Sequence, residues 1–274
     1  MSELFQQAVT NTLPLLQSIE RSVKSPPKAS LATLKKLQAA ANAKAIINTK
    51  PLPAVAAAPL IIREENNSTP WTWSTLEKAI LSCQKCQNLV ASRTQVVFGV
   101  GNRDAELMFI GEAPGADEDK IGEPFVGRAG QLLTKIIEAM GFTRDDIFIA
   151  NILKCRPDMP AGESGNRKPH MDEMTTCLPW LREQIQLVKP RVMVALGATA
   201  AEGLLGETRP MRELRGQWLG FHSIPVMVTY HPAYLLRNQT ITEKRKVWED
   251  MLLVLEKLGH PISEKQRRFF TSAA

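Results

Sequence analysis

The sequence has no uninterrupted run of about 18 apolar residues, the length that a helix needs to cross a bilayer. Its first residues, MSELFQQAVTNTLPLLQ, lack the basic stretch followed by an apolar stretch that directs secretion. We therefore expect a cytoplasmic protein that spans no membrane.

The glycine patterns of the common nucleotide-binding folds are also missing. GEAPG at Gly111–Gly115 is not the GxGxxG fingerprint of dinucleotide-binding folds, and no GxxxxGK[ST] phosphate loop occurs. No H-x-E precedes a P-C-x-x-C, which excludes the zinc deaminases. The excess of charge is small, because 34 Lys and Arg against 28 Asp and Glu leave +6, which favours polyanionic partners only weakly.

The composition changes near residue 70. Residues 1–70 predict an amphipathic helix over Met1–Val23, interrupted at Pro14, and then a disordered tether rich in Ala, Pro and Lys. Residues 71–260 predict a compact domain, and 261–274 a charged, frayed tail.

Short apolar runs alternate with helical patterns in the compact region. The runs that predict buried strands are Leu107–Ile110, Ile147–Leu153, Val192–Leu196 and Pro225–Thr229. The expected helices are Thr75–Leu81 (capped by Ser74), Gln131–Met140, Met171–Val188, Ala198–Leu205 and Ile241–Leu258. This alternation predicts an α/β fold, a three-layer α/β/α sandwich around a central, mostly parallel four-stranded sheet.

Three loops follow the ends of these strands, where ligands bind in α/β folds. The first, Gly111 to Leu133, is rich in Gly and carboxylates. The second begins at Asn151, whose amide either pairs with a nucleobase edge or caps the strand–loop junction; the sequence favours neither. The third begins at His231-Pro232, where an imidazole can donate a hydrogen bond to a charge that develops during reaction.

Two of these loops have a composition that suits DNA. Lys154, Arg156, Arg167 and Lys168 make the second loop basic, as a phosphate-contacting surface is. In the third, Leu235 and Leu236 beside Arg237 form an apolar wedge next to a cation, or else belong to the core.

The four cysteines, Cys83, Cys86, Cys155 and Cys177, all fall in the compact region. A CxxC pair with two remote partners suits a tetrahedral thiolate site, and it does not separate zinc from an iron–sulfur cluster. Redox cysteines and buried apolar cysteines remain alternatives.

Taken together, these motifs resemble the family 4 uracil-DNA glycosylases, the iron–sulfur branch of that superfamily. The resemblance covers Trp71 to Leu258. It rests on GEAPG, EPFVGRAGQLL, NILKCRP, NRKP and HPAYLLR, with all four cysteines in order.

The resemblance implies a role for each of these positions. The four cysteines would ligate a structural [4Fe–4S] cluster. Phe125 would stack on uracil, Asn151 would read its polar edge, and His231 would face its O2. Gly111, Gly115 and Asn166 would line the pocket, and Glu112 or Glu118 would orient the attacking water.

The implied activity is hydrolytic release of uracil from single- and double-stranded DNA by a monomeric, monofunctional glycosylase. Arg156, Arg167 and Arg237 would contact phosphates, and Leu235 or Leu236 would fill the gap left by the flipped base. The alternative functions are a non-catalytic iron–sulfur DNA-binding or polymerase-associated protein with the same fold, and a zinc-stabilised nucleotide-binding protein. The N-terminal arm would recruit a replication or repair protein.

The sequence departs from the resembled pattern around the second loop. Relatives that crosslink to the abasic product carry a basic, His-containing insertion after the Asn strand. Cys155-Arg156-Pro157 follows here instead, so we expect ordinary hydrolysis. The span from Cys155 to Cys177 also looks longer than usual, with Asp158–Ser164 as an extra loop.

Overall fold

The computed structural model describes residues 70–160, 162–163 and 165–271, which belong to a compact unit that begins at Asn67. The predicted helix over Met1–Val23 and the predicted tether lie outside these residues. Within them, every helix is too short or too polar to cross a bilayer.

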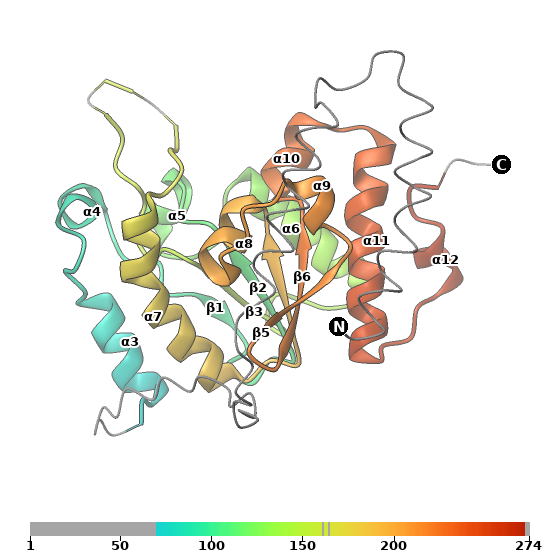
Figure 1. Ribbon diagram of the computed structural model, residues 1–274, viewed down its shortest axis with the longest axis horizontal. Coiled ribbons are helices and arrows are strands. Elements are labelled where there is room, and N and C mark those ends of the chain that lie inside the picture. Colours follow the sequence, from blue (N-terminus) through green and yellow to red (C-terminus); the bar gives the residue numbers. More distant parts are fainter. Residues whose placement is uncertain (1–69, 161, 164, 272–274) are drawn as a thin grey trace, which may run out of the picture. The chain divides into compact units, whose positions relative to one another are not determined.

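A twisted sheet of six strands forms the centre of this unit (Figure 1). The strands are β1 (Val100–Gly101), β2 (Leu107–Gly111), β3 (Phe148–Asn151), β4 (Val192–Leu196), β5 (Trp218–Phe221) and β6 (Ile224–Thr229). Their order is β1-β3-β2-β4-β6-β5, with β3, β2, β4 and β6 parallel to one another. These four are the four predicted strands, and the α/β class is confirmed.

The sheet is nevertheless wider than the four strands expected, because an antiparallel strand is added at each edge. One of these, β1, has only two residues, too few to show a periodic pattern. The other, β5, is mostly half-exposed and therefore has no continuous apolar run.

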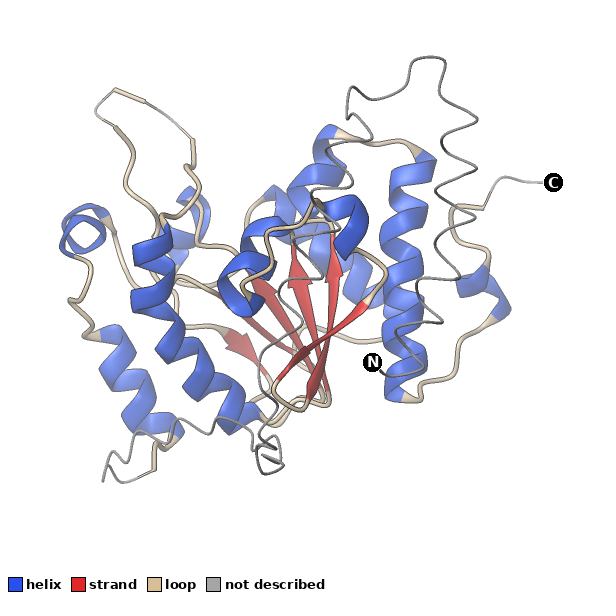
Figure 2. Cartoon of the chain, in the orientation of Figure 1, coloured by secondary structure: helices blue, strands red, loops and turns tan. Residues whose placement is uncertain are grey.

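Helices cover both faces of the sheet, as Figure 2 shows. The helices are α3 (Trp73–Leu81), α4 (Gln87–Ser92), α5 (Ala116–Ile121), α6 (Arg128–Met140), α7 (Met171–Val188), α8 (Ala198–Leu205), α9 (Met211–Leu214), α10 (Pro232–Arg237), α11 (Ile241–Leu258) and α12 (Glu264–Arg267). Alternate residues of β2 point to opposite faces. Met108 and Ile110 join a core cluster with α3, α7 and α8, whereas Leu107 and Phe109 join one with α6 and α11. The predicted three layers are thus present.

Three of the five expected helices, α7, α8 and α11, have the predicted bounds, and the first two begin a few residues earlier than predicted. The first begins at Trp73 and is capped by Thr72, not Ser74, because Thr72 and Thr75 exchange hydrogen bonds between hydroxyl and backbone N–H. The second begins at Arg128, three residues earlier than expected.

Five short segments that the sequence did not predict as helices are helical, namely α4, α5, α9, α10 and α12. Two of them change a prediction. HPAYLLR is not a loop beyond His231: Pro232 begins α10, where the missing N–H of a proline costs nothing. In the predicted tail, Ser263 caps α12, and the Trp248 indole donates to the carbonyl of Gln266 at 2.6 Å. This part of the tail is therefore packed against α11 rather than frayed.

The central strand β2 supplies the first prediction. Phe109 is fully buried between α6 and α11, so Phe109→Ala should lower the free energy of unfolding by about 3–5 kcal/mol, from lost burial and a cavity. Urea denaturation measures this, with Phe270→Ala, an exposed aromatic at 42%, as the matched control expected to cost less than about 1 kcal/mol. Equal effects of the two substitutions would contradict this description of the core.

Candidate functional site

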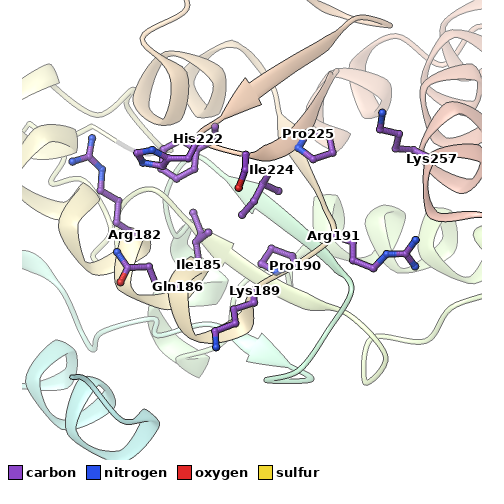
Figure 3. A pocket seen from close by; sticks show the side chains of 12 residues that line it. Arg182, Ile185, Gln186, Lys189, Pro190, Arg191, His222, Ile224, Pro225 and Lys257 are labelled. Carbon is purple, nitrogen blue, oxygen red and sulfur yellow. The ribbon is translucent and has the colours of Figure 1, made fainter. Parts of the chain in front are cut away.

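One cavity, of about 770 Å³, lies away from the three predicted loops. Figure 3 shows Arg182, Lys189, Arg191, His222 and Lys257 around it. Residues Pro190–Arg191 directly precede β4, and β6 begins at Ile224, so this cavity lies at the amino ends of the parallel strands. Its lining contains no carboxylate and no residue of the three loops, so the predicted chemistry does not gather here.

A smaller cavity, about 140 Å³, lies at the carboxyl ends of the strands. It is comparable to a cavity of about 150 Å³ that holds a benzene ring, so it suits a single ring-sized ligand. Its lining joins all three predicted loops: Ala113, Gly115, Glu118, Phe125, Ala129, Asn151, Asn166, His231 and Ala233. The structure therefore brings together six of the predicted site residues.

Asn151 is the last residue of β3 and is only 3% exposed. Its Oδ1 atom is buried and has no hydrogen-bond partner. Within the described residues, it is the one buried side-chain oxygen or nitrogen of which this is true. Parallel pairing sets Asn151 beside Gly111, where a Cβ would lie 2.3 Å from this Oδ1. An orphaned buried acceptor that lines a cavity is a place for a ligand's N–H donor.

Phe125 has a backbone φ of 55°, which is strained for a residue other than glycine. Its ring lies 5.6 Å from the ring of His231, centroid to centroid. The guanidinium of Arg144 donates to the carbonyl oxygens of Pro124 and Phe125 at 2.8 and 3.2 Å. A Cβ on Gly130 would lie 1.9 Å from the Phe125 carbonyl oxygen. Arg144 and Gly130 thus hold the strained turn that aims the ring into the pocket.

The two predicted catalytic carboxylates differ in their surroundings. Glu118 lines the pocket and accepts the N–H groups of Gly115, Val126 and Gly127 at 3.0–3.1 Å. It therefore ties the start of the acidic loop to the turn that carries Phe125. Glu112 lies outside the pocket lining, and burial raises its pKa, although the neighbouring Thr199 hydroxyl opposes this shift.

His231 caps α10 with its own ring, since Nδ1 accepts the N–H of Ala233 at 3.1 Å. A neutral ring that accepts at Nδ1 carries its proton on Nε2, which is thereby left as a donor. Burial, with a smaller contribution from Arg237, lowers the pKa of His231 from 6.5 to about 4. At neutral pH the side chain is a neutral hydrogen-bond donor.

The predicted DNA-contacting residues differ from one another in exposure and in their partners within the protein. Arg156 donates to the Gly165 carbonyl at 2.7 Å and Arg237 is exposed. Arg167 forms ion pairs with Asp158 and Glu173, and these contacts anchor the longer loop. In α10, Leu235 is buried at 4% exposure, so Leu236 is the member of the Leu pair nearer the surface.

All four cysteines line a second small cavity, between the turn before α4, the loop after β3, and α7. Three N–H groups donate to their sulfurs: Arg93 to Cys155 at 3.0 Å, the Lys154 backbone to Cys177 at 3.3 Å, and the Trp180 indole to Cys83 at 3.4 Å. Burial raises the pKa of the Cys177 thiol to about 12. No three His, Cys, Asp or Glu side chains of the described part are arranged around one metal ion.

Comparison with known proteins agrees with this geometry. The uracil DNA glycosylase superfamily model matches residues 98–252. The Type-4 uracil-DNA glycosylase of Thermotoga maritima is 42% identical over 180 residues, which cover 64% of this chain and 89% of that protein. That of Archaeoglobus fulgidus is 36% identical, over 70% of this chain and 94% of that protein. A Type-5 uracil-DNA glycosylase of Pyrobaculum aerophilum is 28% identical, over 62% and 87% respectively.

The chain belongs to the uracil DNA glycosylase superfamily, within its Type-4 family. The predicted resemblance is confirmed. The roles of single residues stay predictions.

Three residues that help to build this Type-4 site were missed in the sequence. Arg144 and Gly130 hold the Phe125 turn. Gly197, which directly follows β4 and has a φ of 94°, packs closely against His231: a Cβ at position 197 would lie 3.0 Å from the Cβ of His231. Gly130 stands in the quoted motif EPFVGRAGQLL, but its contact joins a helix to a turn that the sequence does not place. Arg144 is one of many surface-like arginines, and nothing in its neighbourhood marks it.

The tautomer and pKa of His231 give a prediction for this Type-4 protein. Nitrogen NMR of the imidazole should show a neutral ring protonated at Nε2 at pH 7, with a pKa near 4. Because the unfolded state has the higher pKa of 6.5, it binds the proton first, so His231 lowers stability as pH falls from 6.5 to 4. His231→Gln assigns the signal and should remove this part of the pH dependence. An imidazolium signal for His231 at pH 6 would contradict the neutral ring.

Proposed function

We propose that this protein flips uracil out of single- and double-stranded DNA and hydrolyses its N-glycosidic bond, as a monofunctional glycosylase that starts base-excision repair. Membership of the Type-4 family supports the reaction. The observation that carries the assignment to this chain's own residues is the buried, unpartnered Oδ1 of Asn151 in a ring-sized pocket.

Asn151 supplies the discrimination between bases. Uracil presents an N3–H donor beside the O4 acceptor, which match the Oδ1 acceptor and the Nδ2 donors of one Asn side chain. Cytosine presents an N3 acceptor beside an N4 donor, so it leaves buried groups on both sides unpaired. Phe125 adds stacking of about 1–3 kcal/mol, which is the same for any base and does not select.

His231 supplies stabilisation of the leaving uracil. As the glycosidic bond breaks, negative charge develops on O2, and a neutral imidazole with its proton on Nε2 is a donor for it. One such preorganised donor is worth about 3 kcal/mol of transition-state stabilisation. The ring is held in this orientation by its own bond from the Ala233 N–H, so it need not reorganise during the reaction.

The carboxylates act on the sugar side of the bond. Glu118 lines the pocket, and its negative charge offsets the positive charge that develops on the deoxyribose. Either Glu118 or Glu112 orients the attacking water, and Gly115 and Asn166 complete the wall beside it. The Gly115 backbone permits close approach, since a Cβ there would lie 2.7 Å from Glu118 Oε2.

The DNA is held at the same edge of the sheet. Flipping a nucleotide costs a few kcal/mol, which phosphate contacts offset. In this proposal Arg237 and Arg156 supply such contacts and Leu236 fills the gap in the base stack, which their exposed or partly exposed positions permit. Arg167 is occupied by Asp158 and Glu173, so its part is to hold the loop in which the other residues sit.

A [4Fe–4S] cluster held by Cys83, Cys86, Cys155 and Cys177 fits the cysteine cavity. The fit rests on four sulfurs around one space and on N–H donors to three of them, since such donors surround thiolate clusters. Held by these four cysteines, such a cluster would join the turn before α4, the loop after β3 and α7. Its chemistry is structural, and the steps of uracil release use the residues of the other pocket.

Uracil release tests the assignment of Asn151. The intact protein should free uracil, but not thymine or cytosine, from a single-stranded oligonucleotide and from a U·G duplex. Asn151→Ala should lower kcat/KM at least about 100-fold, because the base then meets no matching polar edge. The brown colour and DNA affinity of Asn151→Ala should be unchanged. Full activity in this variant would refute the base-reading role, and an inactive, DNA-binding parent protein would favour the non-catalytic alternative.

Removal of one thiolate tests the cluster. Cys155→Ala should lose the brown visible absorption and the bound iron together, and it should be poorly soluble, because the crosslink between β3 and α7 is lost. Iron per protein and the visible spectrum measure this, with Asn151→Ala as the control that keeps both. Zinc instead of iron in the intact protein would overturn the cluster assignment.

A further inference from the structure

Lys154 is a fully enclosed lysine that lies between the two sites. It is 2% exposed and has no Asp or Glu partner within the part of the chain that is described. It follows Asn151 by three residues and precedes Cys155 directly. Neither the uracil pocket nor the DNA-contacting set uses it.

Its ammonium group makes two hydrogen bonds, and one of them reaches a residue that lines the uracil pocket. Nζ donates to the backbone carbonyl of Asn151 at 3.0 Å and to Oε1 of Gln184 at 2.5 Å. Gln184, fully buried in α7, is itself held by a bond from its Nε2 to the Phe98 carbonyl at 2.8 Å. Asn151 is thus fixed from both sides, because the next residue, Ile152, donates to the Gly111 carbonyl at 3.0 Å.

These two bonds do not explain why the residue is charged. A neutral donor would satisfy a carbonyl and an amide oxygen, whereas burying an ammonium without a negative partner costs several kcal/mol. The negative groups available are the sulfurs of the cysteine cavity, which Lys154 itself lines, and its own backbone N–H donates to Cys177. Cysteines become thiolates when they bind a metal cluster.

We infer that Lys154 is a positioning residue that couples the two sites: its ammonium is balanced by the thiolates of Cys155 and Cys177, and it holds the backbone of the base-reading Asn151. The inference rests on the proposed function and deepens it. Loss of the cluster leaves the ammonium unbalanced and thereby disturbs the residue that selects uracil. Occupancy of the cysteine site thus controls base recognition through one side chain.

A double-mutant cycle in the full-length protein separates the positioning of Asn151 by Lys154 from a general loss of structure. Lys154→Met should lower single-turnover uracil release about 10-fold in the parent protein but less than about 2-fold in Asn151→Ala, since there is then no reading side chain to position. Lys189→Met, at an exposed lysine, is the matched control and should be neutral in both backgrounds. An equal loss in both backgrounds, or no loss in either, would overturn the inference.

The reduction potential of the cluster gives a second readout that does not depend on activity. Removing a cation beside the thiolates should shift the potential to more negative values in Lys154→Met, and Lys154→Arg should retain the parent value. If Lys154→Met does not fold, Gln184→Glu replaces it: a carboxylate beside the ammonium should shift the potential in the same direction. An unchanged potential in the variants would overturn the coupling. A parent protein that releases no uracil would refute the proposed function instead, and the potential alone would then decide whether Lys154 balances the thiolates.

Discussion

The parallel pairing of β2 with β3 is the constraint on which the site depends, because it sets Gly111 beside Asn151 at the carboxyl ends of these two strands. A Cβ at position 111 would lie 2.3 Å from Asn151 Oδ1 and 2.6 Å from the ring of Phe125. Only a residue without a side chain leaves the amide and the ring where they are. The pocket therefore exists because the strand ends in glycine at the position where its neighbour ends in asparagine.

Around this pair, charged side chains hold the backbone: a carboxylate binds N–H groups, and cations bind carbonyl oxygens. The Glu118 carboxylate accepts N–H groups from both ends of the acidic loop, and the Arg144 guanidinium donates to the carbonyls of the strained Phe125 turn. Lys154 does the same for Asn151. Glu118 binds three backbone N–H groups, Arg144 two carbonyls and Lys154 one, so the site is preorganised before a ligand enters. His231 remains neutral within it.

Much of the layout could be predicted from the sequence, since the four buried strands leave uninterrupted apolar runs and the motifs fall at their carboxyl ends. The edge strands and α10 could not. Two residues of β1 carry no period, and a Pro-containing HPAYLLR has the composition of a loop as well as of a first helical turn. Arg144 and Gly130 could not be found either, because their role is a contact with Phe125 that arises only when α6 packs against the turn.

In the proposed function, a uracil ring occupies the 140 Å³ pocket, where the buried amide of Asn151 reads it. A crystal structure of the protein with free uracil tests this most directly. We expect the ring to stack on Phe125, with N3–H donating to Asn151 Oδ1 and O2 facing Nε2 of His231. Uracil bound instead in the 770 Å³ cavity at the amino ends of the parallel strands, with Asn151 Oδ1 still unpartnered, would contradict this assignment.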